Sequence, residues 1–313
     1  MKKNIASNNK QLDLGKTLII VNPVAQSGKG SQNGQKTFHL FKEKYKQDVD
    51  LFFTTHCGHA TSIAADSAKY DSIIVVGGDG VVHETACGLM KISKKDRPVL
   101  GVVPIGSGND YARSLGISFK AEKAIDEIMH SKIKSVDIGK CNNNYFLETL
   151  SFGIDAGIAV ATMKARQKSK EKGFKLYFKC GIDQILHHFN SFKFTATLDN
   201  KEKIKGNSYI FAIQIGRTYG GGFQITPNAK LSDGLFDICY SCGEFSRKKA
   251  LAIFVAVSKG KHQNMKSFKF KQASKIKLTL EDNAPCQMDG EEYSNTKFNI
   301  EILHKELKVY SIN

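Results

Sequence analysis

Mostly apolar segments alternate with amphipathic segments through the first 140 residues of the chain. The apolar segments predict strands over residues 18–21, 49–54, 72–76 and 99–103. The amphipathic segments between them predict helices over 32–45, 60–68 and 82–90. Apolar strands that alternate with helices are typical of a parallel sheet covered on both faces. The first half is therefore predicted to be an α/β domain.

The pattern changes after about residue 140. Short segments of alternating character predict strands over 145–152, 193–198, 209–216, 235–240, 275–280 and 298–303. Helices are predicted at 158–170, 174–189 and 246–257. Strands with few helices between them favour an antiparallel β-sandwich. We therefore predict two domains, 1–140 and 141–313, with the last segment able to pack back on the first domain.

Composition narrows the class of protein. The chain has 313 residues with 41% hydrophobic and 24% charged residues, which excludes a disordered chain. The longest apolar run, 250–257, is far shorter than the ~20 residues of a membrane-spanning helix. Residues 1–10 are not followed by the apolar core of a signal peptide. A cytoplasmic protein is expected.

The cysteines favour reduced thiols over disulfides, because they are 7 in number and widely scattered. Cys239 and Cys242 have the CxxC spacing, but no second pair or nearby histidine completes a zinc site. Cys57, with His56 and His59 beside it, is a similarly weak metal pattern.

The formal charge of +16 predicts attraction to an anionic partner, such as nucleic acid, an acidic membrane surface or a phosphate-bearing ligand. The aromatic signatures of RNA recognition and the spacings of zinc fingers are absent, and the chain has no Trp. No nucleic-acid partner is therefore expected.

Glycine-rich turns follow the strands predicted at 18–21, 72–76 and 99–103. Ligands of parallel sheets bind beyond the carboxyl ends of the strands, and glycine lets backbone N–H groups approach phosphate oxygens. Together the turns suggest a nucleoside triphosphate. A Walker A loop is excluded because Pro23 and Gly30 occupy positions that it reserves for glycine and for serine or threonine. The dinucleotide fingerprint GxGxxG is also unmatched.

Polar side chains within these turns strengthen the ligand hypothesis. Asp79 can contact a ribose or a phosphate-bound metal, and Asn109 can hydrogen-bond the same ligand. The alternative for both is a turn in which the side chain bonds its own backbone.

The strings VNPVAQSGKG (21–30), VVGGDGVVHE (75–84) and PIGSGNDYAR (104–113) resemble the nucleotide-site motifs of the diacylglycerol kinase catalytic family, in its bacterial lipid kinase branch. The strings LSFGIDAGIA (150–159), YGGGF (219–223), LSDGLFDI (231–238) and QMDGEE (287–292) follow in the family's order. The resemblance covers about residues 16–309 and extends to sphingosine and ceramide kinases. It implies a kinase domain related to phosphofructokinases and NAD kinases, a carboxy-terminal β-sandwich, and ATP in the cleft between them.

The resemblance also implies site residues. Nucleotide contacts carried over by motif are Asn22, Ser27, Gly28, Thr54, Gly77, Gly78, Asp79, Gly80, Val81, Val82, His83, Glu84 and Ser107. A structural Mg²⁺ would be held by the carboxylate of Asp233 and the main-chain carbonyls of Lys230 and Leu235. Asp289 and Glu291 match the pair associated with the catalytic base and the nucleotide site. A carboxylate suits that role because it can orient a lipid hydroxyl and accept its proton.

The sequence departs from the family at two places. Val81 stands where the second motif usually has Thr, and Val24, Ala25 and Gln26 lengthen the first turn by two residues. We expect ATP binding to be retained, with some weakening, because Gly78, Asp79 and Gly80 are intact.

Two basic regions suggest docking on an anionic membrane, since each Lys or Arg near such a surface contributes about 1 kcal/mol. The first holds Lys164, Arg166, Lys168, Lys170, Lys172, Lys175 and Lys179. The second holds Arg247, Lys248, Lys249, Lys259, Lys261, Lys266, Lys269 and Lys271. The alternative is a solvated run of charges.

The predicted function is that of an ATP- and Mg²⁺-dependent lipid kinase that phosphorylates the hydroxyl of a neutral lipid, with diacylglycerol favoured over other lipids. The protein would associate peripherally with the inner face of the membrane. The alternatives are a kinase for sphingoid, ceramide-like or other lipid alcohols, and a weakly active nucleotide- or lipid-binding regulator. The oligomeric state, monomer or homodimer, stays open.

Overall fold

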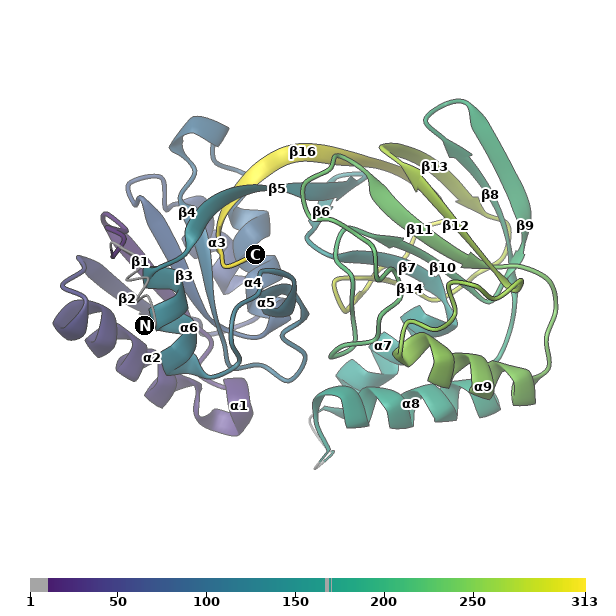
Figure 1. The fold of residues 1–313 in the computed structure, drawn as a ribbon, viewed down its shortest axis with the longest axis horizontal. Helices are drawn as coiled ribbons and strands as arrows, with labels where there is room; N and C mark the ends of the chain where they lie inside the picture. Colours follow the sequence, from purple (N-terminus) through teal and green to yellow (C-terminus); the bar gives the residue numbers. More distant parts are fainter. Residues whose placement is uncertain (1–10, 167–168, 170) are drawn as a thin grey trace, which may run out of the picture.

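The structure, a computed structural model, describes residues 11–166, 169 and 171–313. Figure 1 shows an N-terminal α/β part and a C-terminal part built of two facing sheets, with long strands running between them. The predicted fold class is confirmed, because the N-terminal strands pair in parallel and the second sheet is antiparallel throughout.

The N-terminal part is organised on parallel strands in the order β2-β1-β3-β4. They are β1 (Thr17–Val21), β2 (Val49–Phe53), β3 (Ser72–Gly77) and β4 (Val99–Pro104). Every residue of β1 and β3 is buried, as expected for apolar strands covered on both faces. Val21 pairs with Val76, and Gly77 pairs with Pro104. The loops that follow β1, β3 and β4 therefore start at the same edge of the sheet.

Helices cover both faces of this sheet and follow its strands. They are α1 (Ala25–Gly28), α2 (Gly30–His39), α3 (His59–Ala65), α4 (Asp79–Leu89), α5 (Asp110–Ser114) and α6 (Ala121–Met129), with a π-helical turn η1 (Leu40–Lys44) after α2 and a 3₁₀ turn η2 (Lys94–Asp96) before β4. The helices predicted at 32–45, 60–68 and 82–90 are confirmed as α2 with η1, α3 and α4. Helices α5 and α6 were not predicted from the sequence, although Ala124, Ile125 and Ile128 give α6 a buried face at helical spacing.

One strand joins the two parts. Strand β16 (Lys297–Ser311) pairs with β13 (Lys275–Leu280) in the C-terminal part and with β4 through Val309 and Leu100. It also pairs along most of its length with β5 (Lys132–Cys141), as the long yellow and teal strands of Figure 1 show. The larger sheet is therefore continuous through both parts, which the predicted strand at 298–303 did not reveal.

The C-terminal part is a sandwich of two sheets. Its side of the larger sheet adds β6 (Asn144–Phe146), β8 (Phe192–Leu198) and β9 (Glu202–Ser208). The second sheet contains β7 (Thr149–Gly153), β10 (Ile210–Gln214), β11 (Phe236–Ser241), β12 (Phe268–Ala273), β14 (Cys286–Met288) and β15 (Glu291–Glu292). Phe152, Phe194, Phe211 and Phe298 are buried between the sheets, so phenylalanine supplies much of this core.

The single strand predicted over 145–152 is wrong. The structure divides it into β6 in the larger sheet and β7 in the second sheet, with Leu147 and Glu148 between them. The backbone N–H groups of Leu147, Glu148 and Thr149 donate to the carboxylate of Asp289. A distant side chain therefore accepts the hydrogen bonds that a continuous strand would have given to a neighbouring strand.

Helices α7 (Ile154–Ala165), α8 (Gly173–His187) and α9 (Arg247–Ser258) cover the outer face of the second sheet (Figure 1). Ala212 and Cys239 of that sheet pack against these helices, whereas Phe211 and Ile213 face the other sheet. Helix α7 begins earlier than the predicted 158–170, because Gly153 at φ 91° turns the chain from β7 directly into the helix. The helix ends at Ala165, and residues 167, 168 and 170 of the prediction lie outside the described residues. Among the described residues, no helix is long and apolar enough to cross a membrane.

Candidate active site

The strand-end loops of the N-terminal part lie against one another. The N–H of Asn22 donates to the carbonyl oxygen of Val76 (3.1 Å), and the N–H of Ile105 donates to that of Gly77 (2.9 Å). A Cβ atom at Gly106 would collide with the Cα atom of Gly78 and lie 2.8 Å from Asn109 Oδ1. Glycine is therefore required where the second and third loops touch.

The first loop winds into the short helix α1 before α2 begins. Its exposed Gly28 has φ 94° and open space beside it, so its backbone can be approached by a ligand. The Asn22 side chain accepts from the N–H of Val24 (3.1 Å) and holds the turn. Thr54 is buried at the end of β2, where its N–H donates to the carbonyl oxygen of Val21 (2.8 Å). Ser27 lies in α1.

The other residues that the resemblance assigns to nucleotide binding fall into two groups. Some are accessible at the cleft, and others support the loops. Gly80 is exposed at the start of α4, whereas Val81 and Val82 are buried. Ser107 is exposed in the third loop. Asn109, in the left-handed conformation, accepts from the N–H of Gly106 (2.9 Å) and donates to its carbonyl oxygen (3.0 Å). The Asn109 side chain therefore bonds its own turn, as the alternative interpretation expected.

Three acids gather beyond these loops. Asp79 Oδ1 accepts from the N–H of Tyr111 (3.2 Å). Asp110 accepts from the N–H of Gly221 (2.7 Å) and the hydroxyl of Thr218 (3.0 Å), which ties α5 to the C-terminal part. Glu148 accepts from the hydroxyl of Ser114 (2.6 Å).

The negative charges of these three acids lie close together and repel one another. Burial, followed by the charge of Asp110, raises the pKa of Asp79 to about 7. Burial and the charges of Asp110 and Asp79 raise the pKa of Glu148 well above its ordinary value. Groups with pKa values shifted in this way at a cleft are typical of functional sites. A cation or a set of hydrogen-bond donors would relieve the repulsion.

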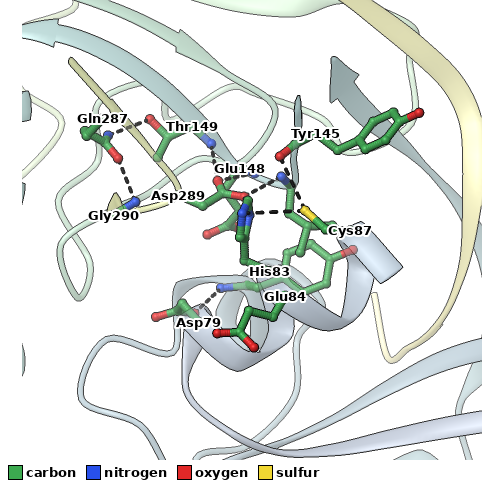
Figure 2. Close-up of polar contacts among 12 residues, drawn as sticks. Asp79, His83, Glu84, Cys87, Tyr145, Glu148, Thr149, Gln287, Asp289 and Gly290 are labelled. Atoms are coloured by element: carbon green, nitrogen blue, oxygen red, sulfur yellow. Dashed lines mark hydrogen bonds and ion pairs between the residues drawn. The ribbon is translucent and has the colours of Figure 1, made fainter. Parts of the chain in front are cut away.

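Asp289 is fixed by four donors on the other side of the cleft (Figure 2). Its Oδ2 accepts from the N–H of Leu147 (2.6 Å) and pairs with His83 Nδ1 (2.8 Å), and its Oδ1 accepts from the N–H groups of Glu148 (3.0 Å) and Thr149 (2.9 Å). Gly290 follows, and its N–H donates to the side chain of Gln287 (2.7 Å). The Asp289 carboxylate is therefore held in one orientation, 6% exposed.

His83 brings a positive charge to this carboxylate. Burial acts to lower the pKa of His83, but its hydrogen bonds with Asp289 and Cys87 and the charge of Asp289 outweigh burial and raise the pKa well above its ordinary value. The raised pKa favours the protonated imidazole, which pairs with Asp289. This pair connects α4 of the N-terminal part to the β14–β15 turn of the C-terminal part.

Glu84 and Glu291 lie on the same side of α4 as Cys57. The Sγ atom of Cys57 lies 3.5 Å from Glu84 Oε1, and one ligand atom each from Cys57, Glu84 and Glu291 falls within 4.8 Å of the other two. The hydrogen bond and charge of Glu84, with burial and the charge of Glu291, raise the pKa of Cys57. Figure 2 shows Glu84 and His83 leaving α4 in different directions.

The residues expected to hold a structural Mg²⁺ lie apart from this cleft, in the loop before β11. Asp233 is exposed, and its Oδ1 accepts from the N–H of Leu235 (3.2 Å); Lys230 is exposed as well. Buried Asp137 supports the loop, since its Oδ2 accepts from the N–H of Gly234 (2.7 Å) and its Oδ1 from that of Lys305 (2.7 Å).

A cavity of about 150 Å³ lies between the acids that follow the strand-end loops and the β14–β15 turn. The expected residues Asp79, Gly80, Asp289 and Glu291 line it. An apolar cavity of about 50 Å³ lies beneath α8 and α9. Tyr177 and Tyr219 line both cavities, so the two cavities are neighbours.

Sequence reasoning assigned no site role to two acids, Asp110 and Glu148. Asp110 follows Asn109 directly in the third motif, so its place after a predicted strand was a usable signal. Glu148 lies inside a segment predicted to be one strand, where nothing in the pattern distinguished it. The free cysteines agree with the expectation of reduced thiols.

Family models match almost the whole described chain. Residues 16–141 match the diacylglycerol kinase catalytic domain, and residues 148–311 match the YegS C-terminal NAD kinase beta sandwich-like domain. A solved NAD kinase from Archaeoglobus fulgidus in complex with ATP has the same fold, with a TM-score of 0.52, 13% identity and coverage of 95% of this chain and 94% of that one. Fold and matches together define a two-domain kinase.

Relatives make the assignment specific. The chain is 28% identical over 284 residues to a diacylglycerol kinase of Bacillus subtilis, covering 87% of this chain and 88% of the relative. It is 29% identical over 299 residues to one of Staphylococcus aureus, covering 94% and 92%. A crystal structure of a Bacillus anthracis diacylglycerol kinase superposes with a TM-score of 0.77 and 26% identity, covering 95% and 97%. This chain belongs to the diacylglycerol kinase catalytic domain family and is a lipid kinase of that family.

Proposed function

We propose that this protein transfers the γ-phosphoryl group of ATP to the hydroxyl of a neutral lipid, with diacylglycerol as the favoured acceptor and phosphatidic acid as the product. The observation that carries the proposal is the position of Asp289. Its fixed carboxylate lines the cavity that also meets Asp79 and the second glycine loop, and this cavity shares Tyr177 and Tyr219 with the apolar one. An acid between a phosphate cradle and an apolar pocket suits a hydroxyl acceptor with an acyl tail.

Asp289 is our candidate for the group that orients the lipid hydroxyl and accepts its proton as the oxygen attacks the γ-phosphorus. His83 pairs with Asp289, and the backbone donors of residues 147–149 fix its position. The proton of the hydroxyl would pass to the Asp289 carboxylate as the P–O bond forms and ADP leaves. Glu291, at the outer rim, would contribute to the nucleotide side of the site.

The residues beyond the loops suit Mg²⁺, because carboxylate oxygens are the ligands that this ion prefers. Asp79 has Asp110 and Glu148 behind it, and burial, followed by the charge of Asp110, raises the pKa of Asp79. We assign the ATP-bound Mg²⁺ to this group and a structural Mg²⁺ to Asp233 with the carbonyls of Lys230 and Leu235. When bound with ATP, Mg²⁺ neutralises charge on the β- and γ-phosphate oxygens.

The outer face of α8 supports a peripheral position on the cytoplasmic face of the membrane. Phe174, Ile182 and Leu186 are 37–42% exposed on this helix, where Lys175 and Lys179 also lie. Apolar side chains beside lysines are suited to an anionic lipid surface. Lys168 and Lys170 of the same basic region lie outside the described residues.

The test is transfer of labelled phosphate from ATP to a panel of vesicle-borne diacylglycerol, ceramide, sphingosine and monoacylglycerol. We expect diacylglycerol to be labelled fastest. The variant Asp289→Asn should lower turnover by at least ~10²-fold, the lower end of the usual contribution of a general base. The exposed neighbour Glu292, which pairs with Lys164, gives the matched control Glu292→Gln with nearly unchanged turnover. Labelling of another lipid alone would replace diacylglycerol, and an active Asp289→Asn would refute the assigned base.

A further inference from the structure

A thiol and two carboxylates from distant parts of the chain meet at the rim of the cleft. Cys57 precedes α3, Glu84 lies on α4, and Glu291 begins β15. One ligand atom from each lies within 4.8 Å of the other two. Donor atoms of a tetrahedral zinc site lie at similar or slightly shorter separations, because each is ~2.0–2.3 Å from the ion.

Neighbouring contacts hold the Glu84 side chain and place the backbone that carries Glu291. Glu84 Oε2 accepts from the N–H of Ala60 (3.2 Å) in the first turn of α3, and the hydroxyl of Thr61 donates to the carbonyl oxygen of Glu84 (2.9 Å). A Cβ atom at Gly88 would collide with Thr61, so α3 and α4 are in close contact. Glu291 is placed by its pairing with Met288 in the β14–β15 hairpin. The cluster is thus set by the fold.

The two carboxylates of this cluster have no ion-pair partner in the described part of the chain. Within the part of the chain that the structure describes, no ion pair involves Glu84 or Glu291, whereas the adjacent Glu292 pairs with Lys164 (3.3 Å). Two carboxylates beside a thiol with no cation are suited to an added metal ion. Thiolate selects Zn²⁺ over Mg²⁺, since Mg²⁺ prefers oxygen ligands only.

We propose that Cys57, Glu84 and Glu291 form a binding site for Zn²⁺, with water in the fourth position. On binding, the thiol proton of Cys57 is released to solvent and the thiolate coordinates the ion. The ion would connect α4 and the segment before α3 to the β14–β15 hairpin, which carries Asp289. This part of the inference rests on the proposed function. The bound ion would inhibit phosphoryl transfer, because Glu84 and Glu291 lie at the nucleotide side of the cleft.

Binding is tested with Zn²⁺ alone, titrated into the full chain under reducing conditions in competition with a chromophoric chelator. We expect one ion per chain and an affinity at least ~10-fold weaker in Cys57→Ser, which removes the thiolate ligand. Cys242→Ser is the matched control, since Cys242 is also partly exposed but donates to Lys266 away from the cleft. Equal Zn²⁺ affinity in the wild type and Cys57→Ser would overturn the site.

Cobalt(II) gives a second readout that does not depend on activity. A bound Co²⁺ should show a thiolate-to-cobalt charge-transfer band in the wild type and Cys242→Ser, and the band should disappear in Cys57→Ser. A band that persists in Cys57→Ser would assign the metal to another cysteine.

Measuring inhibition by Zn²⁺ distinguishes a failure of the metal site from a failure of the proposed function. Without Zn²⁺, Cys57→Ser should turn over like the wild type, and added Zn²⁺ should inhibit the wild type only. Equal inhibition of both chains would refute the link between this site and the cleft. If no chain transferred phosphate to any lipid, the proposed function would fail, while the binding and cobalt measurements would still decide the metal site.

Discussion

Asp289 and Asp155 are both buried carboxylates, but their surroundings differ. Asp289 accepts from three backbone N–H groups and pairs with His83. Asp155, at the start of α7, is 3% exposed, and neither of its carboxylate oxygens has a hydrogen-bond partner of normal geometry among the described residues. The hydroxyls of Ser151 and Tyr219 lie near it and act to lower its pKa, but burial dominates and raises the pKa to about 7.

The Asp155 carboxyl makes stability depend on pH. Its pKa rises from ~3.9 in the unfolded chain to about 7 in the folded protein. Between these values the folded protein holds a proton that the unfolded chain releases. The free energy of unfolding therefore falls as pH rises, by up to ~1.4 kcal/mol per pH unit, and levels off above about pH 7. Asp155→Asn should lose this dependence.

Urea unfolding at pH 5 and pH 7.5 measures the effect, with the exposed Asp183→Asn as the control that keeps the wild-type dependence. Relative to the wild type, Asp155→Asn should gain stability on going to the higher pH. If the two chains lose equal stability over this interval, Asp155 is not the buried acid responsible.

At the scale of elements, the site depends on how closely the strand-end loops approach one another. The second and third loops touch at Gly78 and Gly106, and Asn109 binds both backbone groups of Gly106. The close approach brings the backbone N–H groups of neighbouring loops within reach of one polyphosphate. Gly106 thus allows both the packing between the loops and the binding of the ligand.

A single methyl group at this contact should separate the loops. Gly106→Ala places a Cβ atom against Gly78 and 2.8 Å from Asn109 Oδ1, so we expect a loss of ~1–3 kcal/mol in stability and a clear loss of ATP affinity. Gly206→Ala in β9 is the control, because nothing lies within 4 Å of its Cβ position. Calorimetry with Mg-ATP and thermal unfolding measure both effects. Wild-type ATP affinity in Gly106→Ala would show that the loop contact is not needed for binding.

At the scale of the whole molecule, β16 makes one sheet run through both parts of the chain, and the cleft lies where the parts meet. The lipid-facing surface we propose is on the C-terminal side, on α8. This arrangement would let α8 rest on a membrane while the N-terminal loops hold the nucleotide, so that the lipid hydroxyl and the phosphate meet at Asp289.

Vesicle binding tests this arrangement. The double variant Ile182→Ser/Leu186→Ser removes two exposed apolar side chains of α8 and should weaken co-sedimentation with phosphatidylglycerol vesicles at least several-fold. Phe52→Ser, at an exposed residue of β2 in the other part, should bind like the wild type. Binding should also weaken as salt is raised, because lysines contribute through screened charges. Binding of the α8 variant at wild-type strength would place the contact elsewhere.

The positions of the strand-end loops could be predicted from the sequence, because burial on both faces makes parallel strands continuously apolar and glycine marks the turns after them. Gly78 and Gly106 were found in this way. The meeting of Asp289 with His83 could not be predicted, since it depends on the register of β14 against β7, about 140 residues earlier in the chain. Glu148 escaped notice for the same reason.

The sequence by itself determined the kinds of elements, their order, the division into an α/β part and a sandwich, and the family motifs. These follow from local hydrophobic period and turn chemistry, which act over a few residues. The sequence also suggested that the last segment can pack back on the first domain. The tertiary structure decided the strand that β16 pairs with there, that Asp110 bonds Gly221, and that Cys57 meets Glu84 and Glu291. Such contacts join residues far apart in the chain, and only packing and strand pairing fix which of them come together.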